Sequence, residues 1–316
     1  METLDRLRQR IRAAEQLRSV VSTMKALAAA NIHRFERAAT ALGDADETIL
    51  LGFRALFGDV ALVGGVGEPS LRAGGAPTVI AVAFGSDQGL CGPLDERVAE
   101  RTMELLGRLA SEPREPVTIA VGARLALRLE RLGRPPRVVL RAPISLDGAT
   151  DATLQLAREI ETLRRELEPS EVHLLAARRR IGTALSVRAV RALPLDRRWL
   201  AALGRREWPS RRRPIWPGDR RPLLAALVSE YLFITLFRAQ VESLAAEHAS
   251  RLASMQAAEQ NIERRLAELR AAWSRERQAA ITAQLLDVVS GYETVVAAGE
   301  LTAAARRDRG PRRGGR

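Results

Sequence analysis

The sequence predicts an α/β protein built as a helix, a central α/β domain and a second, very long helix. Two observations support this prediction. Both ends hold long stretches with apolar residues at helical spacing, and the middle alternates apolar strands with helical stretches. Hydrophobic residues make up 46% of the chain but aromatic residues only 4%. This composition agrees with the prediction, because long helices packed through Leu, Ile, Val and Ala need few aromatic side chains.

The N-terminal segment, residues 1–60, is predicted to be a helix. Residues 1–42 contain no Gly and no Pro. Apolar residues recur in steps of three and four: Leu4, Leu7, Ile11, Ala14, Leu17, Val21, Met24 and Ala28. This narrow stripe has the period of an α-helix.

The C-terminal segment, residues 222–291, is predicted to be a much longer helix. Pro222 suits its first turn and Gly291 suits its end. Between Leu223 and Ser290 there is no Gly or Pro, and the apolar stripe has a mean spacing close to the coiled-coil repeat. At about 1.5 Å per residue such a helix is roughly 100 Å long, far more than a globular core needs.

The middle of the chain, residues 76–200, is predicted to be an α/β domain with a largely parallel sheet. The predicted strands are 78–84, 117–121, 137–140, 172–177 and 184–195, and the predicted helices are 94–109, 123–132 and 152–167. Residues 201–221, rich in Arg, Pro and Trp, are predicted to be a linker or insertion, and residues 292–316 a basic, flexible tail.

The positive charge is concentrated in two short segments. The formal net charge is +12, yet residues 205–221 and 306–316 carry most of it through arginines. A nucleic-acid-binding domain usually carries a basic face on its fold, and this distribution does not predict one. The apolar run Leu223–Phe237 is interrupted by Glu230 and is too short to span a bilayer, and the N-terminus lacks an apolar signal core.

A Gly-rich turn, residues 85–92, is the strongest candidate for chemistry. It follows a strand and precedes a helix, but it lacks the Gly-Lys-Ser/Thr of a phosphate-binding loop and the spacing of a dinucleotide fingerprint. A structural turn is the better interpretation. The three histidines lie far apart, so neither a metal site nor a cofactor is predicted, and Cys91 is expected to be a small buried residue.

The two ends and the turn together resemble one family. The segment Ser22-Thr23-Met24-Lys25 resembles the N-terminal helix of ATP synthase gamma subunits, and the run of Ser86, Asp87, Gly89, Leu90, Cys91 and Gly92 resembles that family's turn. The densest similarity lies in the C-terminal helix, at residues 242–251 and 277–291.

The resemblance implies a fold class, a function and partners. The terminal helices would form an antiparallel coiled coil beside a Rossmann-like α/β domain. The chain would be the non-catalytic rotating shaft that couples ion flow to ATP synthesis or hydrolysis, peripheral on the cytoplasmic face of the bacterial inner membrane. Its partners would be the alpha and beta subunits of the catalytic ring, the epsilon subunit and the membrane ring of c subunits. The residues implied to contact the catalytic ring are Met24, Lys25, Arg251, Arg277, Gln278 and Thr282.

Several positions depart from the family pattern. Ser19 and Ser22 stand where the family has lysines, and Gln88 and Pro93 replace an Arg and a Gly. These differences suggest a divergent branch, such as the alternate sodium- or proton-translocating ATPases of some bacteria. The alternative interpretation is a coiled-coil adaptor whose arginine clusters bind nucleic acid or an anionic membrane.

Overall fold

The computed structural model describes residues 4–57, 78–109, 116–167, 171–178, 185–211 and 220–307. The chain divides into two compact units. The terminal unit comprises Met1–Ser22 and Ala258–Arg316, and the domain unit comprises Thr23–Ala257. Of the predicted segments, residues 1–3 and 58–60 of the N-terminal helix, 76–77, 110–115, 168–170 and 179–184 of the α/β domain, 212–219 of the linker and 308–316 of the tail lie outside the described residues.

The domain unit is built on a five-stranded sheet with the order β3-β2-β1-β4-β5. Its strands are β1 (Val79–Phe84), β2 (Pro116–Val121), β3 (Val138–Leu140), β4 (Glu171–Arg178) and β5 (Ser186–Leu193). The first four are parallel, and β5 runs antiparallel to β4 at the edge. Every residue of β1 is buried, which explains why its sequence is apolar without alternation: helices cover both of its faces.

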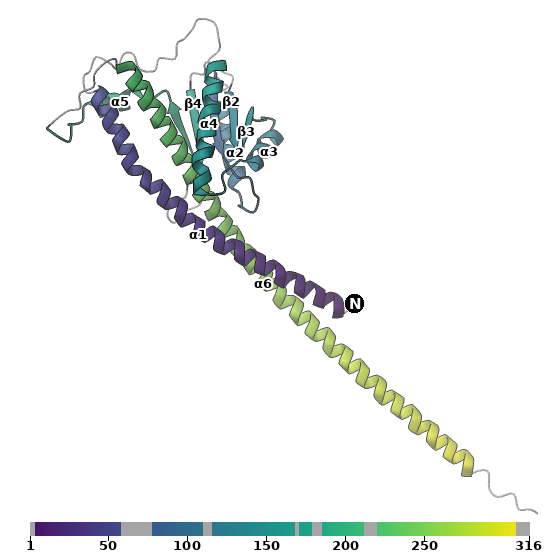
Figure 1. The fold of residues 1–316 in the computed structure, drawn as a ribbon. Helices are drawn as coiled ribbons and strands as arrows, with labels where there is room; N and C mark the ends of the chain where they lie inside the picture. Colours follow the sequence, from purple (N-terminus) through teal and green to yellow (C-terminus); the bar gives the residue numbers. More distant parts are fainter. Residues whose placement is uncertain are drawn as a thin grey trace, which may run out of the picture. The chain divides into compact units, whose positions relative to one another are not determined.

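Helices cover the two faces of the sheet. Helix α4 (Leu146–Leu167) and the first part of α6 (Arg220–Arg307) pack on one face, where Val82, Leu156 and Leu236 meet in one core. Helices α2 (Leu94–Leu109) and α3 (Ala123–Arg131) pack on the other face (Figure 1). Helix α4 begins at Leu146 rather than at the predicted Ala152, because the Ser145 hydroxyl caps it by accepting a hydrogen bond from Gly148 N at 3.2 Å.

The two longest helices pack together within each unit. In the domain unit, α1 (Leu4–Phe57) contacts α6 through an ion pair of Asp46 with Arg238, and the Phe35 and His248 rings stack at 5.5 Å. In the terminal unit, Glu15 accepts a hydrogen bond from Arg270 at 2.6 Å. Within the domain unit the partner numbers on α6 fall as those on α1 rise, so the helices are antiparallel. The predicted fold class is confirmed.

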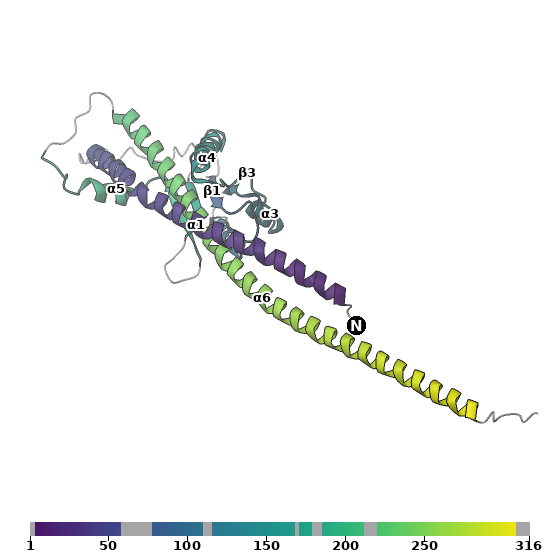
Figure 2. The ribbon, with the colours of Figure 1, turned by 60° about the horizontal axis from the view of Figure 1, so that its bottom comes forward.

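A small aromatic core surrounds the end of α1. Phe53 lies 6.2 Å from the Trp199 ring of α5 (Arg197–Gly204) and 6.0 Å from the Tyr231 ring of α6. Figure 2 shows α5 beside this end of α1. Asp196 caps the start of α5, because its carboxylate accepts a hydrogen bond from Arg198 N. Helix α5 continues through residue 200. The predicted boundary between the α/β domain and the linker, at residues 200 and 201, therefore lies inside a helix.

The predicted end of the long helix at Gly291 is wrong. Helix α6 continues through this position to Arg307. A Gly inside an exposed helix costs only about 1 kcal/mol relative to Ala, so a single Gly does not by itself end a helix. The Thr294 hydroxyl also donates hydrogen bonds to the carbonyls of Ser290 and Gly291 across this point.

Candidate functional site

The family-like turn leaves the sheet at the carboxyl end of β1 and adopts unusual backbone angles. Leu90 and Gly92 have positive φ angles of 68° and 58°. A Cβ on Gly92 would lie 2.8 Å from the Ser254 hydroxyl of α6 on a backbone of positive φ, so a larger residue there would be strained. The strained Leu90 exposes 59% of its surface. The turn therefore passes close to α6 while presenting one apolar side chain to the outside.

Asp87 connects three elements of the domain. Its carboxylate accepts a hydrogen bond from Ala123 N, at the start of α3, at 2.7 Å, and a second from Ala142 N, after β3, at 3.1 Å. The first of these donors is one of the N–H groups that a helix start leaves without an intrahelical partner. The carboxylate thus fixes the turn against the next two connections of the sheet.

A polar network fills the interior of the turn. Asp95, in the first turn of α2, accepts hydrogen bonds from Ser86 N at 2.8 Å and from the Ser86 hydroxyl at 2.7 Å. The Cys91 thiol lies 3.3 Å from the same hydroxyl. Burial, together with the nearby carboxylate of Asp95, raises the pKa of Cys91 to about 11. A thiol in this environment stays protonated and unreactive, which fits the structural role expected for Cys91.

Two serines of α6 fasten this helix to the turn and the sheet. The Ser250 hydroxyl donates to the Cys91 carbonyl at 2.6 Å, and the Ser243 hydroxyl donates to the Phe84 carbonyl at 3.3 Å. Phe84 is the last residue of β1 and Cys91 lies in the turn after it, so both hydroxyls satisfy buried carbonyls where the strand ends. The turn, residues 85–92, together with Asp95, Ser243 and Ser250, therefore joins the sheet to α6, and we call this set of residues the joint.

Beside this joint lies a buried charged pair on α6. Arg251 donates to Glu247 at 2.6 Å, and the two side chains are only 11% and 9% exposed. Burial raises the pKa of Glu247 despite this partner. Burial, with a smaller contribution from Arg251, lowers the pKa of His248 to about 4, so the imidazole that stacks on Phe35 is neutral at pH 7. Arg251, predicted to contact the catalytic ring, is held inside the domain unit.

The other predicted contact residues lie on the two long helices. Met24 and Lys25 are half-buried on α1. Arg277, Gln278 and Thr282 are exposed on α6, where Thr282 donates to the Gln278 carbonyl at 2.9 Å.

In the terminal unit, the Trp273 ring contacts Arg277. The Arg277 guanidinium lies 5.2 Å from the centre of this ring, and the Arg8 guanidinium of α1 lies 5.5 Å from it. Cation–π contacts of this kind hold the long arginine side chains against the helix pair.

Between Gln278 and Val296, α6 is exposed although much of it is apolar. The large apolar residues with exposures between 42% and 72% are Ile281, Leu285, Leu286, Val288, Val289, Tyr292, Val295 and Val296. Such a continuous exposed apolar surface marks a site for another molecule.

A metal centre and a membrane span are two further kinds of site. Within the described ranges, no group of three or more His, Cys, Asp or Glu side chains is placed to hold a metal ion. By length and composition alone, α6 between Arg221 and Val296 could cross a membrane. This is weak evidence, since helices of soluble cores pass the same test, and Leu232, Ile234 and Leu236 of α6 are buried in the domain unit.

Comparison with known proteins identifies the family. The family model described as ATP synthase matches residues 3–295. The ATP synthase gamma chain of a Synechococcus species is 28% identical over 93% of this chain and 100% of its own length. The chain belongs to the ATP synthase gamma-chain family. The gamma chain of Bacteroides thetaiotaomicron is 26% identical over 92% of this chain.

Solved structures agree with this gamma-chain fold. A chain of the Euglena gracilis mitochondrial ATP synthase, in a structure of its OSCP, F1 and c-ring, superposes with a TM-score of 0.58 at 11% identity. It covers 99% of this gamma-family chain and 98% of its own length. A rotor chain of the same enzyme gives a TM-score of 0.56.

Sequence reasoning missed several residues of the joint in this gamma-family chain. Asp95 was not singled out, although an acidic residue in the first turn of a helix after a Gly-rich turn is a recognisable signal. Ser243 and Ser250 were seen only as part of the family-like run. Nothing in the sequence indicates that their hydroxyls reach carbonyls more than a hundred positions earlier.

Proposed function

We propose that this chain is the gamma subunit of a rotary ATP synthase, the central shaft that couples transmembrane ion flow to ATP synthesis or hydrolysis. The observation that carries the proposal is the exposed apolar end of α6, on a helix that is continuous for 88 residues. A free protein would bury such a surface, whereas a shaft presents it to a surrounding sleeve. Membership of the gamma-chain family supports the same function.

The shaft acts by stiffness and asymmetry. Antiparallel helices that pack through apolar seams resist bending better than one helix, because each bend must compress one helix against the other.

The alpha and beta subunits form the ring around the shaft, and the epsilon subunit and the ring of c subunits are its other partners. Met24, Lys25, Arg277, Gln278 and Thr282 are proposed to contact the catalytic ring. Arg251 is left out of this proposal, because its side chain is only 11% exposed and is paired with Glu247. The exposure of Arg277, Gln278 and Thr282 supports this role.

The chain is proposed to have no active site of its own and to need no cofactor. The titratable groups with clearly shifted pKa values in the described part of the chain, at Cys91, Glu247 and His248, lie in or beside the joint. The protein is a peripheral part of a membrane-associated complex. We propose that this complex lies on the cytoplasmic face of the bacterial inner membrane.

Copurification tests the proposal. Tagged full-length chain is isolated from its native membranes, and its partners are identified and quantified by mass spectrometry. We expect alpha, beta, epsilon and c subunits in fixed stoichiometry. Recovery of nucleic-acid-binding proteins, or salt-sensitive retention on anionic lipid without these subunits, would support the adaptor interpretation instead and overturn the shaft.

Truncation tests the role of the exposed end of α6. In the reconstituted complex, a chain that ends before Arg277 is expected to lose the coupling of ATP hydrolysis to ion pumping. Deletion of residues 299–316 is the matched control and is expected to leave coupling intact, because it keeps the apolar surface from Ile281 to Val296. Measured as ions pumped per ATP hydrolysed, equal coupling in both truncated complexes would contradict the proposal.

A further inference from the structure

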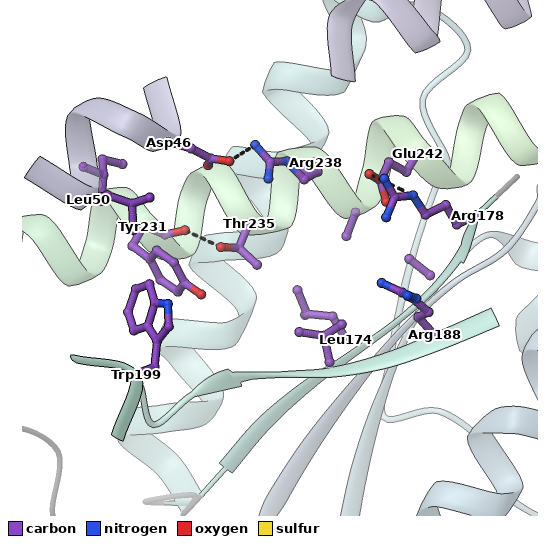
Figure 3. Close-up of a pocket in the computed structure, with 14 residues that line it drawn as sticks. Asp46, Leu50, Leu174, Arg178, Arg188, Trp199, Tyr231, Thr235, Arg238 and Glu242 are labelled. Carbon is purple, nitrogen blue, oxygen red and sulfur yellow. Dashed lines mark hydrogen bonds and ion pairs between the residues drawn. The ribbon is translucent and has the colours of Figure 1, made fainter. Parts of the chain in front are cut away.

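The domain unit contains a cavity of about 400 Å³ between the sheet and the two long helices. Figure 3 shows its lining, which comes from α1, α5, α6, the edge strand β5 and its neighbour β4. Binding sites for small molecules have volumes of about 300–1,000 Å³ and are lined mainly by apolar side chains with a few polar groups. The size and the position of this cavity fit that description.

The floor and one end of the cavity are apolar. Leu174 and Val190 lie opposite one another in the β4–β5 register, and Val190 is 47% exposed although it is aliphatic. Trp199 and Tyr231, whose ring centres are 5.9 Å apart, close one end. At about 30 Å³ for each water-sized group, the volume holds roughly a dozen such groups, which is the size of a short chain with a head group.

The other end of the cavity is basic. Two of its three arginines are paired, Arg238 with Asp46 and Arg178 with Glu242, the latter at 3.5 Å. Arg188 lines the same cavity and makes no hydrogen bond or ion pair with any residue in the described part of the chain. In the β4–β5 register Arg188 pairs with Ala176, so Arg178 is its diagonal neighbour on the same face. The lining therefore carries one excess positive charge beside the apolar floor.

We propose that this cavity binds an amphipathic anion, a phosphate or carboxylate carried on a short apolar chain. The head group is bound by Arg188 with help from Arg178, and the chain lies over Leu174 and Val190 toward Trp199 and Tyr231. A planar guanidinium without a partner is suited to two parallel hydrogen bonds with phosphate or carboxylate oxygens. A ligand here touches the long helices and the sheet at once, and its binding does not depend on the rotary function proposed above.

The test uses the purified full-length chain and octyl phosphate below its micellar concentration. Binding is measured by calorimetry and by the rise in melting temperature, with octanol and inorganic phosphate as the two partial ligands. We expect octyl phosphate to bind and each partial ligand to bind at least about tenfold more weakly, because each lacks one of the two contacts. Equal binding of inorganic phosphate, or no binding of octyl phosphate, would overturn the proposal.

Variants on one strand separate a specific site from general charge attraction. Arg188→Gln removes the unpaired guanidinium, and because Arg188 has no described partner the unliganded protein should melt as before. Arg191→Gln is the matched control: it removes the same charge from β5 outside the cavity lining, where Arg191 lies 3.8 Å from Glu171. We expect about tenfold or greater loss of octyl phosphate affinity in R188Q and none in R191Q. Equal affinities in R188Q and the unmodified chain would refute the assignment.

Flotation with vesicles that contain phosphatidylglycerol distinguishes the two sources of such a ligand. Vesicle binding that R188Q abolishes identifies a membrane lipid, and octyl phosphate binding without flotation identifies a free amphiphile. Either result supports an amphipathic anion in this cavity.

Discussion

Replacing Asp87 should destabilise the domain unit by an amount that follows from its two hydrogen bonds. The carboxylate accepts from Ala123 N at 2.7 Å and from Ala142 N at 3.1 Å. Hydrogen bonds to a charged group contribute about 1.5–3 kcal/mol each, and the half-buried position of Asp87 favours the lower end of this range. Asp87→Ala should therefore cost about 3 kcal/mol, and Asp87→Asn, which keeps one acceptor oxygen, about half of that.

The measurement is thermal unfolding of the full-length chain followed by circular dichroism. For a domain of this size, about 3 kcal/mol corresponds to a fall in melting temperature of about 6–12 °C. Asp151→Asn is the control, because Asp151 is an exposed residue of α4. The reasoning is refuted if D87A melts within a degree or two of D151N, since Asp87 would then not hold the turn.

Three further outcomes are expected from the same domain unit. Gly122→Ala should destabilise strongly, because Gly122 has a φ of 112° and a new Cβ would lie 2.7 Å from the Ser86 carbonyl oxygen; Gly133→Ala, with a φ of 76° but open space, should cost much less in urea unfolding. His248 has a pKa lowered to about 4, so between pH 6.5 and 4 the unfolded chain binds more protons and stability should fall as the pH falls. His248→Gln should flatten this dependence and His33→Gln, at an exposed site, should not; equal slopes for both variants would contradict the assignment. Cys91, the only cysteine, should resist iodoacetamide at pH 8 until the protein is denatured, because burial raises its pKa to about 11; rapid labelling of the native chain would show that the turn opens.

Local patterns in the sequence predicted the secondary structure well. The Gly- and Pro-free ends gave the two long helices, and the apolar runs at 78–84 and 172–177 gave strands close to their observed positions. Where prediction failed, a local signal was overruled by its surroundings. Gly291 is a common helix-ending residue, but α6 continues through it, because one Gly in a helix interior costs only about 1 kcal/mol. The opposite error occurred at Ser145, whose capping of α4 was overlooked.

The sequence by itself determined the fold class and the family, because periodicity and short residue runs are properties of neighbouring positions. Only the tertiary structure decided which distant groups meet. It brought the Ser250 hydroxyl of α6 to the carbonyl of Cys91, which lies 159 positions earlier in the chain. It also brought Arg188 of β5 to the same cavity as Trp199 and Tyr231. Such contacts depend on how the sheet and helices pack, since side chains far apart in the chain become neighbours only after the backbone has placed them.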